Sequence, residues 1–507
     1  MNPANAQPHV VIVGGGISGL AAAFFLRDQA VRVTVLEGSP QLGGKLRVSE
    51  IAGVAVDEGA EALLVTRPEG TGLIAEAGLA DQRVMPGTTS AAIWTRGALH
   101  PLPRRQYMGV PSDMAELARS GVLSADGVTR ARQDLELPPT ARDGDVPVAR
   151  YIAARFGDEV VDRLVDPLLG GVYAGRSAEL SFDATLPRLA AVSRQHRSLA
   201  GAVLSLLPPP PAERTDEKET PGSGTRAGSV FTTLAGGLGT LPDVLGKASA
   251  AAVRTGAMAR ELSCTDSGWR LAVGSAAAPE HVDADAVIIA VPARPAGRLL
   301  AKVPGVSAAV AAFGEISYAS MAIVTLAYPR SAFPRPEHRA ERGPEHESES
   351  GLGLGASGLS GYLVPAVDGR AVKATTFSTV KWPHLAAAPP PGAEALEIVR
   401  CSVGRIGEEA LLQRDDDDLA SLAAAELMEA TGVRGAPVAT RVTRWGGALP
   451  QYTVGHLDRV ARIRATMATQ PGLAICGAAY DGVGIPACVA TAREAVDQVL
   501  AFLSARR

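Results

Sequence analysis

The sequence predicts a fold of the α/β (α+β) class, organised around a parallel-sheet domain at its amino end. Two observations predict it. The apolar run Val10–Val13 suits a buried parallel strand and leads into the glycine cluster Gly14–Gly19, which has the form G-x-G-x-x-G. A helical run follows, and a second apolar run, Val31–Leu36, ends on the acidic Glu37. Strand, glycine turn, helix, strand and acid in this order form the Rossmann-like βαβ unit that binds dinucleotides.

Each part of this unit has a role in holding a dinucleotide. Gly14 permits the tight turn, Gly16 lets the backbone approach a pyrophosphate, and Gly19 lets the helix pack close to the strand. The free N–H groups and the positive dipole end at the helix start favour phosphates. Glu37 is placed to accept hydrogen bonds from ribose hydroxyls. The predicted binding residues of this unit are Gly14, Gly16, Ile17, Ser18, Gly19, Glu37 and Gly38.

Composition limits the function classes. A chain of 507 residues is expected to form two or three domains, and a net charge of −4 argues against nucleic acid as a partner. The four cysteines show no C-x-x-C spacing, which favours a reducing compartment and neither a metal site nor a disulfide scaffold. The sequence shows no signal peptide and no apolar run of spanning length. We therefore expect a cytoplasmic protein without a transmembrane segment, and a peripheral membrane contact stays open.

Two polar stretches interrupt the pattern. Leu207–Gly228 and Phe333–Gly358 are rich in charge, Gly and Pro and carry no periodicity, so we interpret them as loops or insertions. His338 and His346 lie in the second stretch, and His384 lies beyond it. Their spacing fits no metal motif, so we predict no metal site.

A glycine doublet narrows the ligand. Gly43-Gly44-Lys45 follows Glu37 closely. It resembles the x-G-G-[RK]-x doublet that follows the dinucleotide fold in FAD-dependent amine oxidases, carotenoid desaturases and porphyrinogen oxidases, and that NAD dehydrogenases lack. The resemblance implies FAD as the cofactor, with Gly44 and Lys45 at the site and Lys45 facing a flavin phosphate.

Further motifs make the resemblance more specific. They are Gly59–Ala62, Asp166–Gly175, Leu234–Leu241, Arg444–His456 and Leu473–Cys488. In this order they are similar to segments of the FAD-dependent protoporphyrinogen oxidase and coproporphyrinogen III oxidase family of the Gram-positive type, and the resemblance spans nearly the whole chain. Ala60 stands where the family has proline and Leu63 where it has an aromatic residue, which leaves the shape of that loop open.

The family resemblance implies further contacts. The loop after Gly59 passes the flavin, Val253 lies against the adenine through its backbone, and the closing turn meets the pyrimidine side of the isoalloxazine. Arg67 sits where relatives carry a basic residue near the substrate. His456 is interpreted as a hydrogen-bonded structural residue, with a role as general base as the alternative, and we name no catalytic residue. The implied additional FAD contacts are Gly59, Ala60, Glu61, Ala62, Val253, Trp445, Gly477, Val483, Gly484 and Ile485.

The resemblance also implies the domain organisation. An FAD-binding domain of the p-hydroxybenzoate-hydroxylase/amine-oxidase type is expected from three segments, 8–85, 226–298 and 466–507. A helical lobe with part of the substrate domain is expected over 86–225, and a mixed-sheet substrate-binding domain over 299–465.

The implied function is the FAD- and oxygen-dependent six-electron oxidation of coproporphyrinogen III to coproporphyrin III, with release of H2O2, in haem biosynthesis. A ferrochelatase would receive the product through a transient contact. Protoporphyrinogen IX is the alternative substrate. Another flavin amine oxidase or desaturase, or a carrier without turnover, explains fewer of the motifs.

Overall fold

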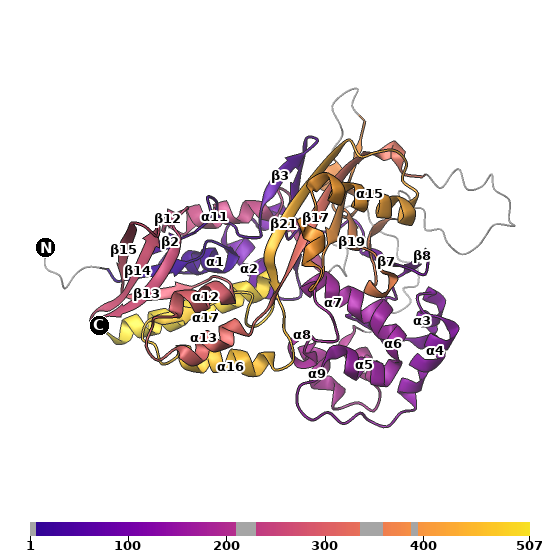
Figure 1. Ribbon diagram of the computed structural model, residues 1–507, viewed down its shortest axis with the longest axis horizontal. Helices are drawn as coiled ribbons and strands as arrows, with labels where there is room; N and C mark the ends of the chain where they lie inside the picture. Colours follow the sequence, from indigo (N-terminus) through magenta and orange to yellow (C-terminus); the bar gives the residue numbers. More distant parts are fainter. Residues whose placement is uncertain (1–6, 209–229, 335–357, 387–393, 507) are drawn as a thin grey trace, which may run out of the picture. The chain divides into compact units, whose positions relative to one another are not determined.

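The computed structural model of the protein describes residues 7–208, 230–334, 358–386 and 394–506 (Figure 1). It divides into two compact units. The first unit consists of Met1–Val84, Phe231–Ala319 and Trp445–Arg507, and the second consists of Met85–Val230 and Ser320–Arg444. Most of the two predicted insertions, Leu207–Gly228 and Phe333–Gly358, lies outside the described residues. The finer domain boundaries that the sequence predicts stay a prediction.

A parallel sheet forms the centre of the first unit. Its strand order is β12-β2-β1-β16-β22, and all four neighbouring pairs are parallel. The predicted βαβ unit is therefore confirmed, and the chain returns to this sheet from distant parts of the sequence. The strands are β1 (His9–Val13), β2 (Arg32–Leu36), β12 (Ala252–Arg254), β16 (Ala286–Ile289) and β22 (Leu473–Ile475).

Apolar side chains cover both faces of this sheet. On one face Val10 and Ile12 of β1 share a buried cluster with helices α1 (Ile17–Phe25), α11 (Leu241–Ala248) and α17 (Ile485–Ala505). On the other face Val11 and Val13 share a cluster with helices α12 (Ala293–Leu300), α13 (Ser307–Gly314) and α16 (His456–Met467). A strand that is buried on both faces reads as a continuous apolar run, which is why β1 was predictable.

Smaller elements complete the first unit. Helix α2 (Pro68–Glu76) packs against α17. Two- and three-stranded sheets are built from β3 (Val48–Ile51) and β4 (Val54–Asp57), from β5 (Leu63–Leu64), β11 (Phe231–Leu234) and β6 (Arg83–Val84), and from β13 (Ala259–Thr265), β14 (Gly268–Gly274) and β15 (Pro279–Ala284).

The second unit contains a mixed sheet of seven strands. Its order is β21-β17-β20-β19-β18-β7-β8, and β18 pairs with β7 in parallel while the other recorded pairs are antiparallel. Helix α15 (Asp416–Thr431) buries Leu419, Ala423 and Leu427 against this sheet. The strands are β7 (Ser90–Thr95), β8 (Ala98–Pro101), β17 (Tyr318–Pro329), β18 (Leu359–Leu363), β19 (Val372–Phe377), β20 (Leu396–Val403) and β21 (Ala439–Pro450).

Short helices make up most of the rest of the second unit. They gather in one group in Figure 1. They are α3 (Met114–Ser120), α4 (Ala125–Arg132), α5 (Val148–Phe156), α6 (Asp158–Val160), α7 (Asp166–Tyr173), α8 (Phe182–Thr185), α9 (Pro187–Ser193) and α10 (Leu199–Leu206). The sequence predicts a helical lobe in this part of the chain, and that lobe stays a prediction.

A buried ion pair joins these helices. The Asp134 and Arg155 side chains are 0% and 2% exposed, and Nε of Arg155 lies 2.5 Å from Oδ1 of Asp134. The same carboxylate accepts the N–H groups of Leu199 and Ala200 at 3.0 and 2.8 Å, at the start of α10. The Asp134 carboxylate therefore balances the charge of a buried guanidinium and accepts hydrogen bonds from the free N–H groups at a helix end.

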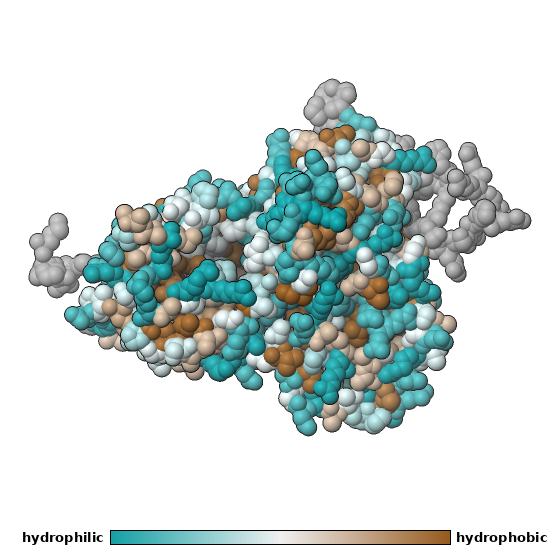
Figure 2. All heavy atoms as spheres, in the orientation of Figure 1, coloured by the Kyte–Doolittle hydropathy of each residue, from teal (hydrophilic) through white to brown (hydrophobic). Residues whose placement is uncertain are grey.

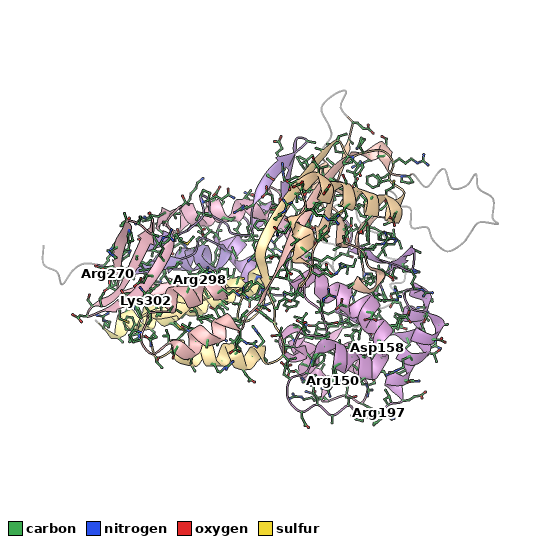
Figure 3. All side chains as sticks on the ribbon, viewed as in Figure 1. Arg150, Asp158, Arg197, Arg270, Arg298 and Lys302 are labelled. Atoms are coloured by element: carbon green, nitrogen blue, oxygen red, sulfur yellow. The ribbon has the colours of Figure 1, made fainter. Side chains whose placement is uncertain are left out.

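Replacing Asp134 by Ala should lower the free energy of unfolding by about 3–5 kcal/mol, because a buried guanidinium loses its counter-charge. Urea denaturation followed by circular dichroism measures the loss. The matched control is Glu261→Ala, which breaks the exposed pair with Lys302 (labelled in Figure 3) and should leave the midpoint nearly unchanged. Equal midpoints for both variants would contradict the role given to Asp134.

A buried lysine lies in the mixed sheet. Lys373 of β19 is 3% exposed, and its Nζ donates a hydrogen bond to the Gly404 carbonyl at 2.5 Å. Burial, and after it the nearby Arg405 guanidinium, lower the pKa of Lys373 to about 7. The unfolded chain therefore binds more protons than the folded chain between pH 7 and the ordinary lysine pKa of about 10.4.

The free energy of unfolding should accordingly rise with pH across this window, with a contribution of at most about 1.4 kcal/mol per pH unit from Lys373. Below pH 7 both states are protonated and the cost of the buried charge is fully present. We expect Lys373→Met to show a flatter pH dependence than the parent in urea titrations at pH 7, 8 and 9. Lys302→Met, at an exposed position, is the control and should keep the parental slope. A parental slope in Lys373→Met would refute the assignment.

Candidate functional site

The turn after β1 leaves open space at one glycine. A Cβ atom on Gly14, where φ is +110°, would lie 2.6 Å from the Ala290 carbonyl oxygen, and a Cβ on Gly19 would collide with the Gly14 carbonyl oxygen. A Cβ on Gly16 would meet no described atom within 4 Å. The first and third glycines thus serve the packing of strand and helix, whereas the second faces open space, as the predicted approach of its backbone to a phosphate requires.

Glu37 follows β2 and holds this turn. Its Oε2 accepts the Gly15 N–H at 2.7 Å, and its Oε1 accepts the Ser39 N–H at 2.7 Å. Each carboxylate oxygen keeps a second lone pair, so Glu37 retains the capacity to accept a ribose hydroxyl. The sequence predicts only the ribose contact. The bond to Gly15 spans 22 residues and has no local signal.

The glycine doublet lies directly on the same turn. The Gly43 N–H donates to the Gly15 carbonyl at 2.8 Å, and φ is +106° at Gly43 and +59° at Gly44. A Cβ on Gly44 would lie 3.4 Å from Cα of Gly16. Both positive φ values favour glycine, so the doublet is needed to bring this loop, and Lys45 after it, beside Gly15 and Gly16.

Two helix amino ends meet here. Helix α17 begins after Gly484, and the Gly477 N–H, in the loop that precedes it, donates to Oγ1 of Thr491 at 3.1 Å. Helices α1 and α17 pack together, and Oγ of Ser18 in the first turn of α1 would lie 3.9 Å from a Cβ on Gly477 in the loop before α17. The free N–H groups and the positive dipole ends of both helices therefore lie close together.

Two cationic side chains add to the positive electrostatic potential of the helix ends. Lys45 and Arg67 both act on Cys488 and favour its thiolate, although burial has the larger effect and raises the pKa of the Cys488 thiol. Burial lowers the pKa of the Lys45 ammonium, and Lys45 makes no salt bridge within the described part of the chain. Arg67 pairs with Glu69 at 3.1 Å. Two helix ends and Lys45 together favour an anion such as a diphosphate.

Trp445 joins the loop at Gly59 to this region. Its Nε1 donates to the Glu58 carbonyl at 3.1 Å, and the Arg47 guanidinium lies 5.2 Å from the centre of its ring. A Cβ on Gly59 would lie 3.2 Å from the Trp445 ring and would collide with the Lys45 carbonyl. Gly59 is thus required for close packing. Ala60, Glu61 and Ala62 follow it before β5.

Val253 lies in β12 at the edge of the parallel sheet. It is in register with Val35 of β2, and the Glu37 N–H donates to the Arg254 carbonyl at 2.9 Å. The predicted adenine contact is therefore next to the predicted ribose contact. The first unit brings together the glycine turn, Glu37, the doublet, the loop at Gly59, Trp445, Val253 and the turn before α17.

Sequence reasoning missed two supporting residues. Asp57 of β4 accepts the N–H groups of Leu238 and Gly239 at 3.0 and 2.8 Å, which fixes the glycine-rich turn before α11. Tyr452 contacts the loop before α17. The Asp57 bonds span more than 180 residues. The only sequence signal for them is that Asp57 and the motif Leu234–Leu241 occur in the same chain.

The cysteines form no disulfide. All four are free, and Cys264 is exposed while Cys401, Cys476 and Cys488 are buried. Burial raises the pKa of each of the three buried thiols. In the described ranges no group of three or more His, Cys, Asp or Glu residues is placed to hold a metal ion.

Figure 2 shows how hydrophilic and hydrophobic residues are distributed over one face of the protein. Hydrophilic residues cover most of this face, and hydrophobic residues occur in separate small patches. Among the helices that the structure describes, none is long and apolar enough to cross a membrane.

The sequence of the chain matches the family model of flavin containing amine oxidoreductases over residues 17–500. The chain belongs to this family. It is therefore an FAD-dependent oxidoreductase, and the cofactor and enzyme class predicted from the sequence are confirmed. FAD supplies a two-electron acceptor, and the protein supplies binding, orientation and electrostatics.

Individual proteins match along nearly the whole chain. The coproporphyrinogen III oxidase of Mycobacterium tuberculosis (strain H37Rv) is 38% identical and that of Bacillus subtilis (strain 168) is 30% identical. These alignments cover 98% of this chain and 98% and 99% of the two relatives. A crystal structure from Exiguobacterium sp. 255-15, assigned as a protoporphyrinogen oxidase, superposes with a TM-score of 0.79 at 28% identity, over 97% of this chain and 99% of that one. The predicted fold class is confirmed.

Gly16 offers a direct test of the phosphate position. Its φ of −76° suits any residue, and a Cβ would meet open space. Gly16→Ala should therefore leave the fold intact yet place a methyl group where the sequence predicts the diphosphate. We expect the affinity for FAD to fall at least about tenfold, or about 1.4 kcal/mol, in equilibrium dialysis of the holoenzyme.

The matched control is Gly72→Ala in α2, where a Cβ would also meet open space. This variant should bind FAD as the parent does. Parental affinity in Gly16→Ala would place the diphosphate elsewhere.

Proposed function

We propose that the protein catalyses the FAD- and oxygen-dependent oxidation of coproporphyrinogen III to coproporphyrin III in haem biosynthesis. The main support is the match, along almost the full length of both chains, to coproporphyrinogen III oxidases. Removal of six hydrogens from one porphyrinogen reduces three molecules of O2 to three of H2O2. FAD takes two electrons at a time, so one substrate requires three rounds of reduction and reoxidation.

The proposed FAD site uses the residues that the first unit brings together. Glu37 accepts the ribose hydroxyls, while Gly16, the start of α1 and Lys45 receive the diphosphate. Val253 lies at the adenine, and the turn before α17 lies at the pyrimidine ring of the flavin. The complete proposed set is Gly14, Gly16, Ile17, Ser18, Gly19, Glu37, Gly38, Gly44, Lys45, Gly59, Ala60, Glu61, Ala62, Val253, Trp445, Gly477, Val483, Gly484 and Ile485.

Arg67 is proposed as a substrate contact. It precedes α2, its side chain is 40% exposed, and its Nη1 would lie 3.7 Å from a Cβ on Gly482. The arginine therefore borders the loop assigned to the flavin while keeping part of its guanidinium accessible. A propionate of the substrate would compete with Glu69 for this group. No catalytic residue is proposed, because the oxidation chemistry belongs to the cofactor.

Protoporphyrinogen IX is the second candidate substrate, favoured by the match to the Exiguobacterium structure. It carries two propionates where coproporphyrinogen III carries four. The two proposals are separated by turnover of the purified holoenzyme on both substrates side by side.

We expect faster turnover, as kcat/KM, on the four-propionate substrate, with three H2O2 formed per porphyrin. Porphyrin fluorescence and peroxide are followed together, and heat-inactivated enzyme is the control for spontaneous oxidation. Preference for protoporphyrinogen IX would reverse the substrate assignment. Failure with both substrates by FAD-loaded protein would favour another oxidase of the family or a carrier.

The location and partner follow from this function. We propose a cytoplasmic enzyme that passes its product to a ferrochelatase in a transient contact. Adding a ferrochelatase and Fe²⁺ to the turnover assay should convert product without its accumulation in solution. Full accumulation of free coproporphyrin before metal insertion would argue against direct transfer.

A further inference from the structure

The loop between β22 and α17 is held by a tyrosine that lies outside it. Oη of Tyr452 donates to the Ala478 carbonyl at 2.7 Å and accepts the Gly482 N–H at 2.8 Å. One hydroxyl therefore ties together two points of the loop that are four residues apart. Tyr452 is 1% exposed, whereas Ala478 and Gly482 are half-buried, so both bonds are shielded from water at the tyrosine end.

His456 supports the same arrangement. Its ring stacks on the Tyr452 ring, with the centres 3.8 Å apart and the planes inclined by 14°. Its Nε2 lies 3.3 Å from the Tyr480 carbonyl, to which it donates. His456 is 0% exposed, so the stack fixes the direction in which the Tyr452 hydroxyl points. This agrees with the structural role predicted for His456.

A third contact comes from α16. Nη1 of Arg464 donates to Oδ1 of Asp481 at 3.0 Å. Tyr452, His456 and Arg464 thus contact Ala478, Tyr480, Asp481 and Gly482. We call these three side chains the loop clamp.

The loop between β22 and α17 has little regular structure of its own. It contains no helix or strand, and φ is +132° at Gly477 and +137° at Gly482. Both values belong to conformations that few residues adopt, so the loop is not stabilised by regular hydrogen bonding. Val483, Gly484 and Ile485 come directly after the last clamped residue, and α17 begins at Ile485.

We propose that Tyr452 is a positioning residue for the flavin: through Ala478 and Gly482 it sets the place of Val483, Gly484 and the first turn of α17. This inference rests on the proposed flavin contacts of those residues. Tyr452 acts through the loop and is not assigned a contact with the cofactor.

The test is Tyr452→Phe in the full-length holoenzyme. Phenylalanine keeps the ring volume and the stack on His456 and removes only the hydroxyl. The half-buried Gly482 N–H and Ala478 carbonyl then lose this partner, which costs free energy and frees the loop to shift. We expect the dissociation constant for FAD to rise about tenfold in equilibrium dialysis. The visible absorption bands of the FAD that stays bound should change in position and shape.

Tyr480→Phe is the matched control. The Tyr480 side chain is 2% exposed and lies in the same loop, but its hydroxyl has no hydrogen-bond partner among the described residues. Removing that hydroxyl should leave the FAD affinity and the absorption bands at parental values. The comparison separates the clamp from the general effect of removing a buried hydroxyl.

Arg464→Gln is the second variant and guards against misfolding of the first. Arg464 is 44% exposed, so this variant should fold, and loss of the Asp481 tie should weaken FAD binding about two- to threefold. Parental affinity and spectra in both Tyr452→Phe and Arg464→Gln would overturn the proposal. Weak FAD binding by the parent protein itself would overturn the proposed cofactor site, which is a distinguishable result.

Discussion

The nucleotide-binding unit depends on one close approach of backbone to backbone. Helix α1 starts so near the end of β1 that a Cβ at Gly19 would collide with the Gly14 carbonyl oxygen. This contact aims the amino end of α1 at the space in front of Gly16. The other parts then follow, because the doublet lies against Gly15 and Gly16 and the loop at Gly59 lies against Lys45. Successive contacts at glycine residues thus fix the positions of the outer loops relative to the first strand.

Electrostatics adds a second constraint on the same space. Helices α1 and α17 pack together, and Ser18 in the first turn of α1 lies beside Gly477 in the loop before α17, so two sets of free N–H groups converge. Lys45 beside them is partly desolvated and unpaired by salt bridges in the part of the chain that the structure describes. Such a site is costly without an anion and favourable with one. The binding energy of a diphosphate cofactor therefore also contributes to the stability of the first unit.

Much of this arrangement could be predicted from the sequence, because the residues that form it lie close together along the chain. The glycine turn, Glu37 and the doublet lie within 31 residues, so their spacing alone predicts the unit. The hydrogen bonds of Asp57, Trp445 and Tyr452 could not be predicted in this way. Their partners lie 181, 387 and 26 to 30 residues away, and an ordinary Asp, Trp or Tyr carries no local sign of a distant carbonyl. Glu37 combines the two situations. Its position at the end of the second strand predicts a ribose contact, whereas nothing near it in the sequence predicts its hydrogen bond to Gly15.

The distribution of cysteines has a consequence for the lifetime of an enzyme that releases peroxide. Thiolates react with peroxide much faster than thiols do, and burial keeps Cys401, Cys476 and Cys488 protonated. Cys264 in β13 is the one cysteine exposed to solvent. Among the cysteines, oxidation should therefore begin at this surface strand. The same thiol is a single attachment point for a spectroscopic or surface label.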